Sequence, residues 1–191
     1  YTGIQRQHLG FSQYTVTTSD SDDLWEDAYV KAFRNAVLAE RAATNEGIEG
    51  ITIGITQVLQ AYAIGTTTSL FGDVPFTEAV DENVDNPTFQ SQTEVYAQVQ
   101  GLLDQAIANL QSGKGKPVTG SDIYFNGDED AWTEVAYTLK ARFYMHTQEY
   151  ANALSAASNG ISTADNSMYA PHGTAQLQSN LTYQFFAIAV R

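Results

Sequence analysis

Apolar residues recur every three or four positions in five segments of the chain, a periodicity that predicts an all-α protein. The expected helices cover about 24–44, 48–70, 92–111, 130–147 and 149–163. The third segment has the clearest stripe, formed by Val95, Val99, Leu102, Leu103, Ala106 and Leu110. The apolar face of a helix is shielded from water when it packs against the apolar face of another helix, so we expect a stack of helices.

The first two helices differ in the size of their inward residues. Small residues dominate the stripe of the first helix, which favours close packing: Trp25, Ala28, Tyr29, Ala32, Ala36 and Ala39. An acidic cluster at 20–23 precedes it, at the positive end of the helix dipole. In the second helix we expect larger side chains to point inward, namely Ile55, Val58, Leu59, Tyr62 and Ala63, although Thr and Gly at 65–68 weaken its end.

Three segments are rich in turn-forming residues and predict loops. Residues 72–91 carry Gly, Asp, Asn and two prolines, and irregular loops of this length are often functional. Residues 111–121 read QSGKGKPVTGS, which is a flexible connection. Its lysines lack the spacing of a phosphate-binding loop, so we expect no nucleotide cofactor. Residues 164–180 form the third loop.

The most informative segment is 122–142, DIYFNGDEDAWTEVAYTLKAR, in which a polar turn leads into a helix. Asn126, Gly127, Asp128 and Asp130 supply turn and cap chemistry. The apolar face that follows has helical spacing and consists of Trp132, Val135, Ala136, Leu139 and Phe143. This pattern indicates a fold and does not by itself indicate a function.

The same turn can be compared with a calcium-binding loop. Five residues match loop positions one, five, six, seven and nine, in the order Asp122, Asn126, Gly127, Asp128 and Asp130. However, Tyr124 stands where a third-position oxygen is needed, and Thr133 stands where the last glutamate is needed. Helix capping is therefore the preferred interpretation, and we expect no metal here.

The last two helices resemble a tetratricopeptide unit, a helix pair of about 34 residues. Large and small residues alternate at the spacing of that repeat: Tyr137, Ala141, Tyr144, Ala153 and Ala157. Gly160 also falls at a close-packing position. We interpret the first two helices as a degenerate copy of this unit, and the third and fourth as a possible further one.

Composition excludes several classes of function. Nine basic and 22 acidic residues give a net charge of −13, which disfavours nucleic acids and anionic membranes as partners. A neutral or cationic ligand is easier to accommodate, although an acidic surface also serves solubility alone. Cysteine is absent, so the chain has no disulfide and no cysteine-bound metal. The apolar run at 181–190 is shorter than the roughly 20 residues of a membrane span, and we expect it in a core or an interface.

The residue patterns of common catalytic sites are missing. The three histidines, His8, His146 and His172, have no metal-ligand spacing, and no G-x-S-x-G elbow occurs. Acidic residues are so frequent that chance pairs are certain, and no pair singles itself out as that of a glycosidase. We expect no hydrolase or transferase activity, no cofactor and no metal.

Two motifs tie the chain to a family, and their order along the chain also fits. FGDVP occupies 71–75, and D-x-Y-x-x-G-D-x-x-x-W-x-x-x-A-x-x-L-x-x-R follows it and ends at Arg142. Together they resemble the signature of the SusD/RagB family of outer-membrane nutrient-binding lipoproteins. The motif residues that we assign a structural role are Phe71, Gly72, Asp73, Pro75, Asp122, Gly127, Asp128, Trp132, Leu139 and Arg142. The resemblance implies a single tetratricopeptide-like domain over 1–191.

The resemblance also implies a function and a place. Members bind oligosaccharides or peptides without cleaving them, and they cover a TonB-dependent, SusC-like barrel on the extracellular face of the outer membrane. A lipid holds their N-terminus, whereas this chain begins at Tyr1 with neither a signal peptide nor a lipidated cysteine. Members are commonly a few hundred residues long, so we expect the N-terminal part of a longer protein.

Aromatic residues in the loops are the candidates for ligand binding. Sugar rings pack their C–H faces on flat aromatic rings, and Tyr14, Phe76 and Phe89 lie outside the expected helices. Trp25 and Trp132 lie on apolar stripes, where a structural role is expected. The alternative function is a helical-repeat scaffold that binds proteins through its surface and does not bind glycans.

Overall fold

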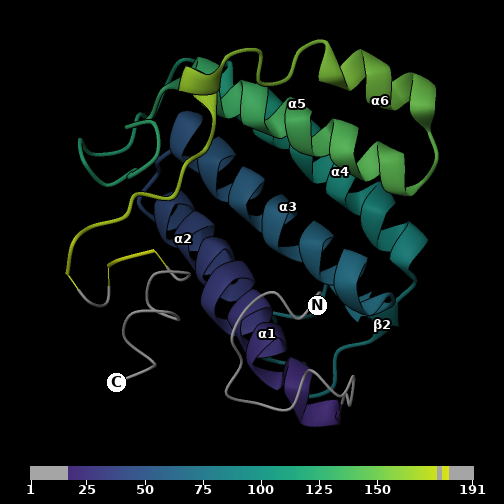
Figure 1. Cartoon of the computed structure of the whole chain (residues 1–191). Helices are drawn as coiled ribbons and strands as arrows, with labels where there is room; N and C mark the ends of the chain where they lie inside the picture. The colour runs from purple at the N-terminus through teal and green to yellow at the C-terminus, as the bar shows by residue number, and fades with distance from the viewer. Residues whose placement is uncertain (1–16, 176–177, 181–191) are drawn as a thin grey trace. The chain divides into compact units, whose positions relative to one another are not determined.

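The computed structural model describes residues 17–175 and 178–180, which are largely helical (Figure 1). Residues Leu24–Met168 form one compact unit, and the described residues outside this range belong to a second. The helices are η2 (Thr18–Ser21), α1 (Asp22–Glu26), η3 (Asp27–Phe33), α2 (Arg34–Asn45), α3 (Ile51–Phe71), α4 (Gln92–Leu110), α5 (Glu129–His146), α6 (Tyr150–Ala157) and η4 (Ala164–Asn166). Two short strands, β1 (Val74–Pro75) and β2 (Phe89–Gln90), pair antiparallel.

Consecutive helices of the larger unit run antiparallel, from α2 through α3, α4 and α5 to α6 (Figure 1). The helix α3 lies in the middle and packs against α2, α4 and α5. Because neighbours cover most of its surface, residues on nearly every side of α3 are buried. The predicted all-α stack of helix pairs is confirmed.

Two glycines allow α3 to approach its neighbours closely. A Cβ atom added at Gly54 would lie 2.7 Å from Cγ of Leu110 on α4. A Cβ atom added at Gly65 would overlap the ring of Phe143 on α5. Since Phe143 is fully buried, its ring has no free space to move into. The glycines that weaken α3 as an isolated helix are therefore needed for its packing.

The predicted stripes of the third and fourth helices are confirmed. On α4, five of the six predicted residues are buried and Leu102 is half-buried, and on α5 the whole stripe from Trp132 to Phe143 is buried. Side chains also fix where these helices begin. Ser91 and Glu94 form a capping box at α4, and Asp128 caps α5 by accepting from two backbone N–H groups. The capping interpretation of the 122–130 turn is thus confirmed for Asp128.

The prediction for the first helix was wrong in its inward face. Ala36 is buried as expected, but Ala32 and Ala39 are exposed, and Phe33 is buried instead. The reason is the π-helical segment η3, whose wider turns move the inward face one position along the chain. Aromatic residues therefore fill this interface, with the rings of Trp25 and Tyr29 4.6 Å apart.

Three further predictions were wrong in detail. The second helix begins at Ile51 and not at 48, because Gly50 has a φ of 73°, outside the helical region. Tyr62 was expected inside but is 47% exposed, because it borders an open pocket that α3 and α5 line. The last helix ends at Ala157, which is exposed, while Ala156 is buried. Gly160 lies after that helix and is buried beside Thr138.

The described part of the second unit contains little regular structure. Residues Thr18–Ser21 form a short 3₁₀ helix, whose N-cap is Thr17. Near the C-terminus, the backbone N–H of Gly173 donates to the carbonyl of Gln178 at 2.8 Å. The apolar run at 181–190 lies outside the described residues, so its predicted core or interface role stays a prediction. None of the described helices has the length and hydropathy of a membrane-spanning helix.

Candidate ligand-binding site

The first motif, FGDVP, anchors the loop 72–91 at both of its ends. Phe71 packs edge-on against Trp25, with ring centres 5.0 Å apart, and Gly72 ends α3. Asp73 accepts a hydrogen bond from the backbone N–H of Gln92 at 2.9 Å, which ties the start of the loop to the start of α4. The Tyr29 hydroxyl donates to the carbonyl of Pro75 at 2.7 Å. Burial raises the pKa of Tyr29 above its ordinary value.

The loop was predicted to be irregular but contains the short pair β1 and β2. Val74 pairs with Gln90, and Pro75 pairs with Phe89. Two side-chain bonds extend this closure, because Gln90 accepts from the backbone N–H of Thr77 at 2.9 Å and Glu78 accepts from that of Thr88 at 2.8 Å. These contacts hold the first residues of the loop, 74–78, against its last residues, 88–90.

The three loop aromatics differ in their surroundings. Phe89 lies on β2 and is 62% exposed, so its ring is open to a ligand. Phe76 is half-buried and packs on the core, with its ring centre 5.7 Å from that of Phe33. Tyr14 lies outside the described residues. A role in ligand binding stays a prediction for all three.

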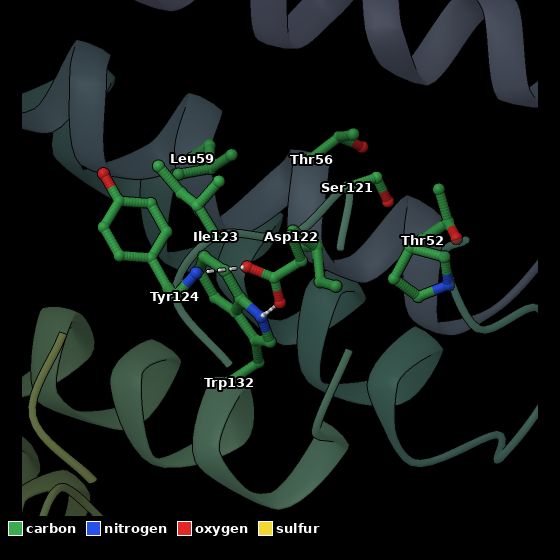
Figure 2. A pocket seen from close by; sticks show the side chains of 10 residues that line it. Thr52, Thr56, Leu59, Ser121, Asp122, Ile123, Tyr124 and Trp132 are labelled. Carbon is green, nitrogen blue, oxygen red and sulfur yellow. Dashed lines mark hydrogen bonds between the residues drawn. The ribbon is translucent and has the colours of Figure 1, made fainter. Parts of the chain in front are cut away.

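The second motif is organised around the carboxylate of Asp122 (Figure 2). Its Oδ2 atom accepts from Nε1 of Trp132 at 2.7 Å and from the N–H of Gly127 at 2.8 Å. Its Oδ1 atom accepts from the N–H groups of Tyr124 and Phe125, at 2.9 and 3.3 Å. One side chain therefore fixes the whole turn and satisfies the only side-chain donor of a fully buried tryptophan.

The remaining residues of the second motif shape the same region. Gly127 has a φ of 76°, and a Cβ atom there would lie 2.7 Å from Cδ of Pro117, so only glycine fits without strain. Leu139 is buried in the core. Arg142 is exposed on α5, with its guanidinium carbon 5.7 Å from the centre of the Phe143 ring.

Opposing effects set the pKa of Asp122. Partial burial alone would raise it, but the hydrogen bonds from the Trp132 indole and from three backbone N–H groups outweigh that effect, so the pKa lies below its ordinary value of 3.8. A carboxyl group whose pKa is lower in the folded state stabilises the fold above its unfolded pKa. This contribution is lost as the pH falls through the folded pKa.

We expect this effect in the acid stability of the protein. At pH 7 the wild type should be more stable than Asp122→Asn, and the gap should narrow as the pH is lowered below about 4. Chemical denaturation at pH 7, 4 and 3, followed by tryptophan fluorescence, measures both variants. A gap in the free energy of unfolding that stays constant over this range would show that Asp122 has an ordinary pKa.

A pocket of about 330 Å³ opens beside this turn, between α3 and the segment 117–124 (Figure 2). The turn supplies Ile123 and Tyr124 to the lining, and the Asp122 carboxylate accepts from the backbone N–H of Tyr124. The helix α3 supplies the side chains of Thr52, Thr56 and Leu59. Below the turn, Trp132 closes the floor.

The described residues offer no arrangement typical of metal chemistry, since no three His, Asp or Glu side chains among them converge on one point. Both oxygens of Asp122 are already occupied by N–H donors. The site therefore presents aromatic and apolar surface with a few hydroxyl groups, which suits non-covalent binding.

Sequence reasoning did not find the pocket. Thr52, Thr56 and Ile123 were not singled out, and Tyr124 was noted only as a motif residue and as a poor calcium ligand. The pocket depends on contacts between residues more than 50 positions apart, such as Thr52 with the carbonyl of Gly115. The motif itself was the one available signal, because it pairs an aspartate with a tryptophan ten residues later.

Comparison with known proteins gives a consistent result. A SusD-like family model, described as "Starch-binding associating with outer membrane", matches residues 1–187. Among solved structures, a SusD/RagB family protein from Bacteroides thetaiotaomicron is 28% identical, with a TM-score of 0.71 over 81% of this chain and 34% of that one. No curated protein matches the chain.

Two further solved structures carry a ligand in their names. A chitin-binding protein is 23% identical, with a TM-score of 0.71 over 82% of this chain and 35% of that one. A chitin-binding SusD homologue from Flavobacterium johnsoniae is 22% identical, with a TM-score of 0.57 over 74% of this chain and 30% of that one. These two likenesses concern the fold. The chain spans about a third of the length of all three structures.

Proposed function

Because the chain belongs to the SusD-like family, we propose that it is a non-catalytic cell-surface protein that captures oligosaccharides for uptake through the outer membrane. The observation that carries this proposal is the family match over residues 1–187, whose description names both starch binding and association with the outer membrane. The chitin-binding names of two structural neighbours also favour a polysaccharide-derived ligand over a peptide.

Phe89 is the residue that we propose as the main sugar platform in this chain. Phe89 belongs to the anchored β1–β2 pair and its ring is exposed, so little side-chain or loop ordering is needed when a ligand binds. Tyr14 and Phe76 complete the proposed set. The loop carries the acidic side chains of Glu78, Asp81 and Asp85, which disfavour anionic ligands and leave neutral glycans as the fitting class.

We expect Phe89→Ala to weaken glycan binding by about tenfold, because an aromatic contact contributes on the order of 1 kcal/mol beyond the burial of its area. Maltotriose and triacetylchitotriose are the probes, and calorimetry measures the affinity. The matched control is Tyr150→Ala on α6, whose side chain is 60% exposed, compared with 62% for Phe89. Equal affinities for both variants would remove Phe89 from the site.

The proposed lack of catalysis can be tested directly. Family membership supports it, since the family description names binding and no reaction. Prolonged incubation with the two trisaccharides should leave them intact in chromatography. Release of shorter sugars by the purified wild type would contradict the proposal.

We propose that the partner is a TonB-dependent, SusC-like barrel, with this protein on the extracellular side of the membrane and held by an N-terminal lipid. Association of the family with the outer membrane supports this placement. A tagged full-length protein should bring down a large barrel protein from solubilised outer membranes. Repeated purification without any barrel would overturn the partnership.

We also propose that the chain is the N-terminal part of a longer protein. It forms one SusD-like helical domain in this proposal, and it covers only 34% of a family member of known structure. Part of the ligand surface then lies in the remaining portion. A mass measurement of the protein in its native source, well above 20.9 kDa, is the expected result.

One observation keeps a protein-binding scaffold as the second candidate. The outer helix α6 exposes Tyr150 and Leu154, one turn apart, and Leu154 is 75% exposed. Exposed apolar residues on one helix face are typical of protein contacts. Binding of a protein partner without binding of any glycan would favour this alternative.

A further inference from the structure

The pocket beside Asp122 has two sides of different chemistry (Figure 2). On one side, Thr52 and Ser121 donate their hydroxyl hydrogens to the carbonyls of Gly115 and Val118, at 2.6 Å each. Thr56 donates within α3 at 2.7 Å. Because each hydrogen is used, the three oxygens offer only lone pairs to a ligand. This side selects a molecule that carries hydrogen-bond donors.

The other side is apolar and includes one unused hydroxyl group. Leu59, Ile123 and Tyr124 gather there, and Ile123 is 63% exposed at the mouth. Tyr124 packs edge-on against Trp132, with ring centres 6.1 Å apart, which fixes its ring. In the described structure the Tyr124 hydroxyl has no hydrogen-bond partner. It is thus free to donate to a ligand or accept from one.

Charge narrows the class of ligand to neutral molecules. None of the described residues that line the pocket is Lys, Arg or His, so an anion finds no counter-charge. The Asp122 carboxylate repels anions, and its four N–H donors leave no free oxygen for a cation. A volume of about 330 Å³ lies at the lower end of the range for ligand pockets, roughly 300–1,000 Å³.

We propose that this pocket is a second carbohydrate site, separate from Phe89, that takes one pyranose ring of a neutral oligosaccharide. The hydroxyl groups of the sugar donate to the threonine and serine oxygens, and the C–H face of the ring packs on Leu59 and Ile123. The Tyr124 hydroxyl forms a hydrogen bond with a polar group at the edge of the pyranose ring. The assignment rests on the proposed function for its ligand class, whereas the position follows from the pocket itself.

The test is an NMR titration of the ¹⁵N-labelled 191-residue protein with maltotriose and with triacetylchitotriose. The amide signals of Ile123 and Tyr124 should shift with one of them. Tyr124→Phe, which removes only a hydroxyl group, should weaken binding at these signals about two- to tenfold. Ile123→Asp, at an exposed position, should abolish it. The matched control is Tyr150→Phe on α6, which should leave the affinity unchanged.

Three results would overturn the proposal. Shifts near Phe89 without shifts at Ile123 and Tyr124 would remove the pocket site and leave the proposed function intact. Shifts at Ile123 and Tyr124 whose affinity is unaffected by both variants would show that the sugar binds elsewhere and acts on the turn indirectly. The absence of shifts anywhere, with either trisaccharide, would count against the pocket and the proposed function together.

Discussion

Replacing Asp122 with alanine should lower the free energy of unfolding by about 2–3 kcal/mol, since hydrogen bonds to a charged group contribute roughly 1.5–3 kcal/mol and a buried donor is left unpaired. The carboxylate accepts from the indole of Trp132, which is fully buried, and from three backbone N–H groups of the turn. Without it, water has to reach these groups or the turn has to open. Chemical denaturation at pH 7 measures the loss.

The matched control for this prediction is Asp85→Ala. Asp85 is an exposed aspartate of the loop 72–91, and its removal should leave the stability nearly unchanged. Asp122→Asn should lie between wild type and alanine, because its amide oxygen still accepts hydrogen bonds. If Asp122→Ala proves as stable as the wild type, the aspartate does not hold the turn.

Adding one methyl group at Gly65 should destabilise the protein by about 1–3 kcal/mol, which is the usual range for overpacking a core. The new Cβ atom would overlap the ring of Phe143, which is fully buried and lies 5.7 Å, centre to centre, from the ring of Tyr96 on α4. Normally, glycine to alanine inside a helix is stabilising, so the expected sign is opposite to that of helix propensity. Thermal and chemical unfolding of Gly65→Ala check it.

Gly101→Ala provides the control within the same fold. Gly101 lies on the exposed side of α4, and a Cβ atom there would have no heavy atom within 4 Å. Helix propensity then acts alone, and the substitution should stabilise the protein by roughly 0.5–1 kcal/mol. If Gly65→Ala and Gly101→Ala both raise the free energy of unfolding, the close packing between α3 and α5 is contradicted.

Most of the fold could be predicted because the helices carry their apolar residues at regular spacing. The stripes of α4 and α5 are examples, since each residue there depends on helical geometry alone. The register of the first helix could not be predicted, because η3 has π-helical turns that no local pattern signals. Tyr62 was misplaced for a related reason. Periodicity shows that a residue is on a face, whereas neighbours in space decide whether that face is covered.

The candidate site could be predicted only in part. The motif located Asp122 and Trp132, but the carboxylate–indole bond between them was not foreseen from their spacing of ten residues. Thr52 and Tyr124 come together through the packing of a distant loop on α3, which sequence spacing does not encode. Phe89 and Phe76 lie in the same predicted loop, but Phe89 is exposed and Phe76 packs on the core, a difference that the sequence does not indicate.

A glycan array probed with the purified 191-residue protein tests whether the protein captures neutral oligosaccharides. We predict reproducible binding to at least one family of neutral glycans, with starch- and chitin-derived chains as the first candidates. Phe89→Ala should reduce that signal and Tyr150→Ala should not. A folded wild-type protein that binds no glycan on the array, while it still binds a protein partner, would contradict the claim and favour the scaffold.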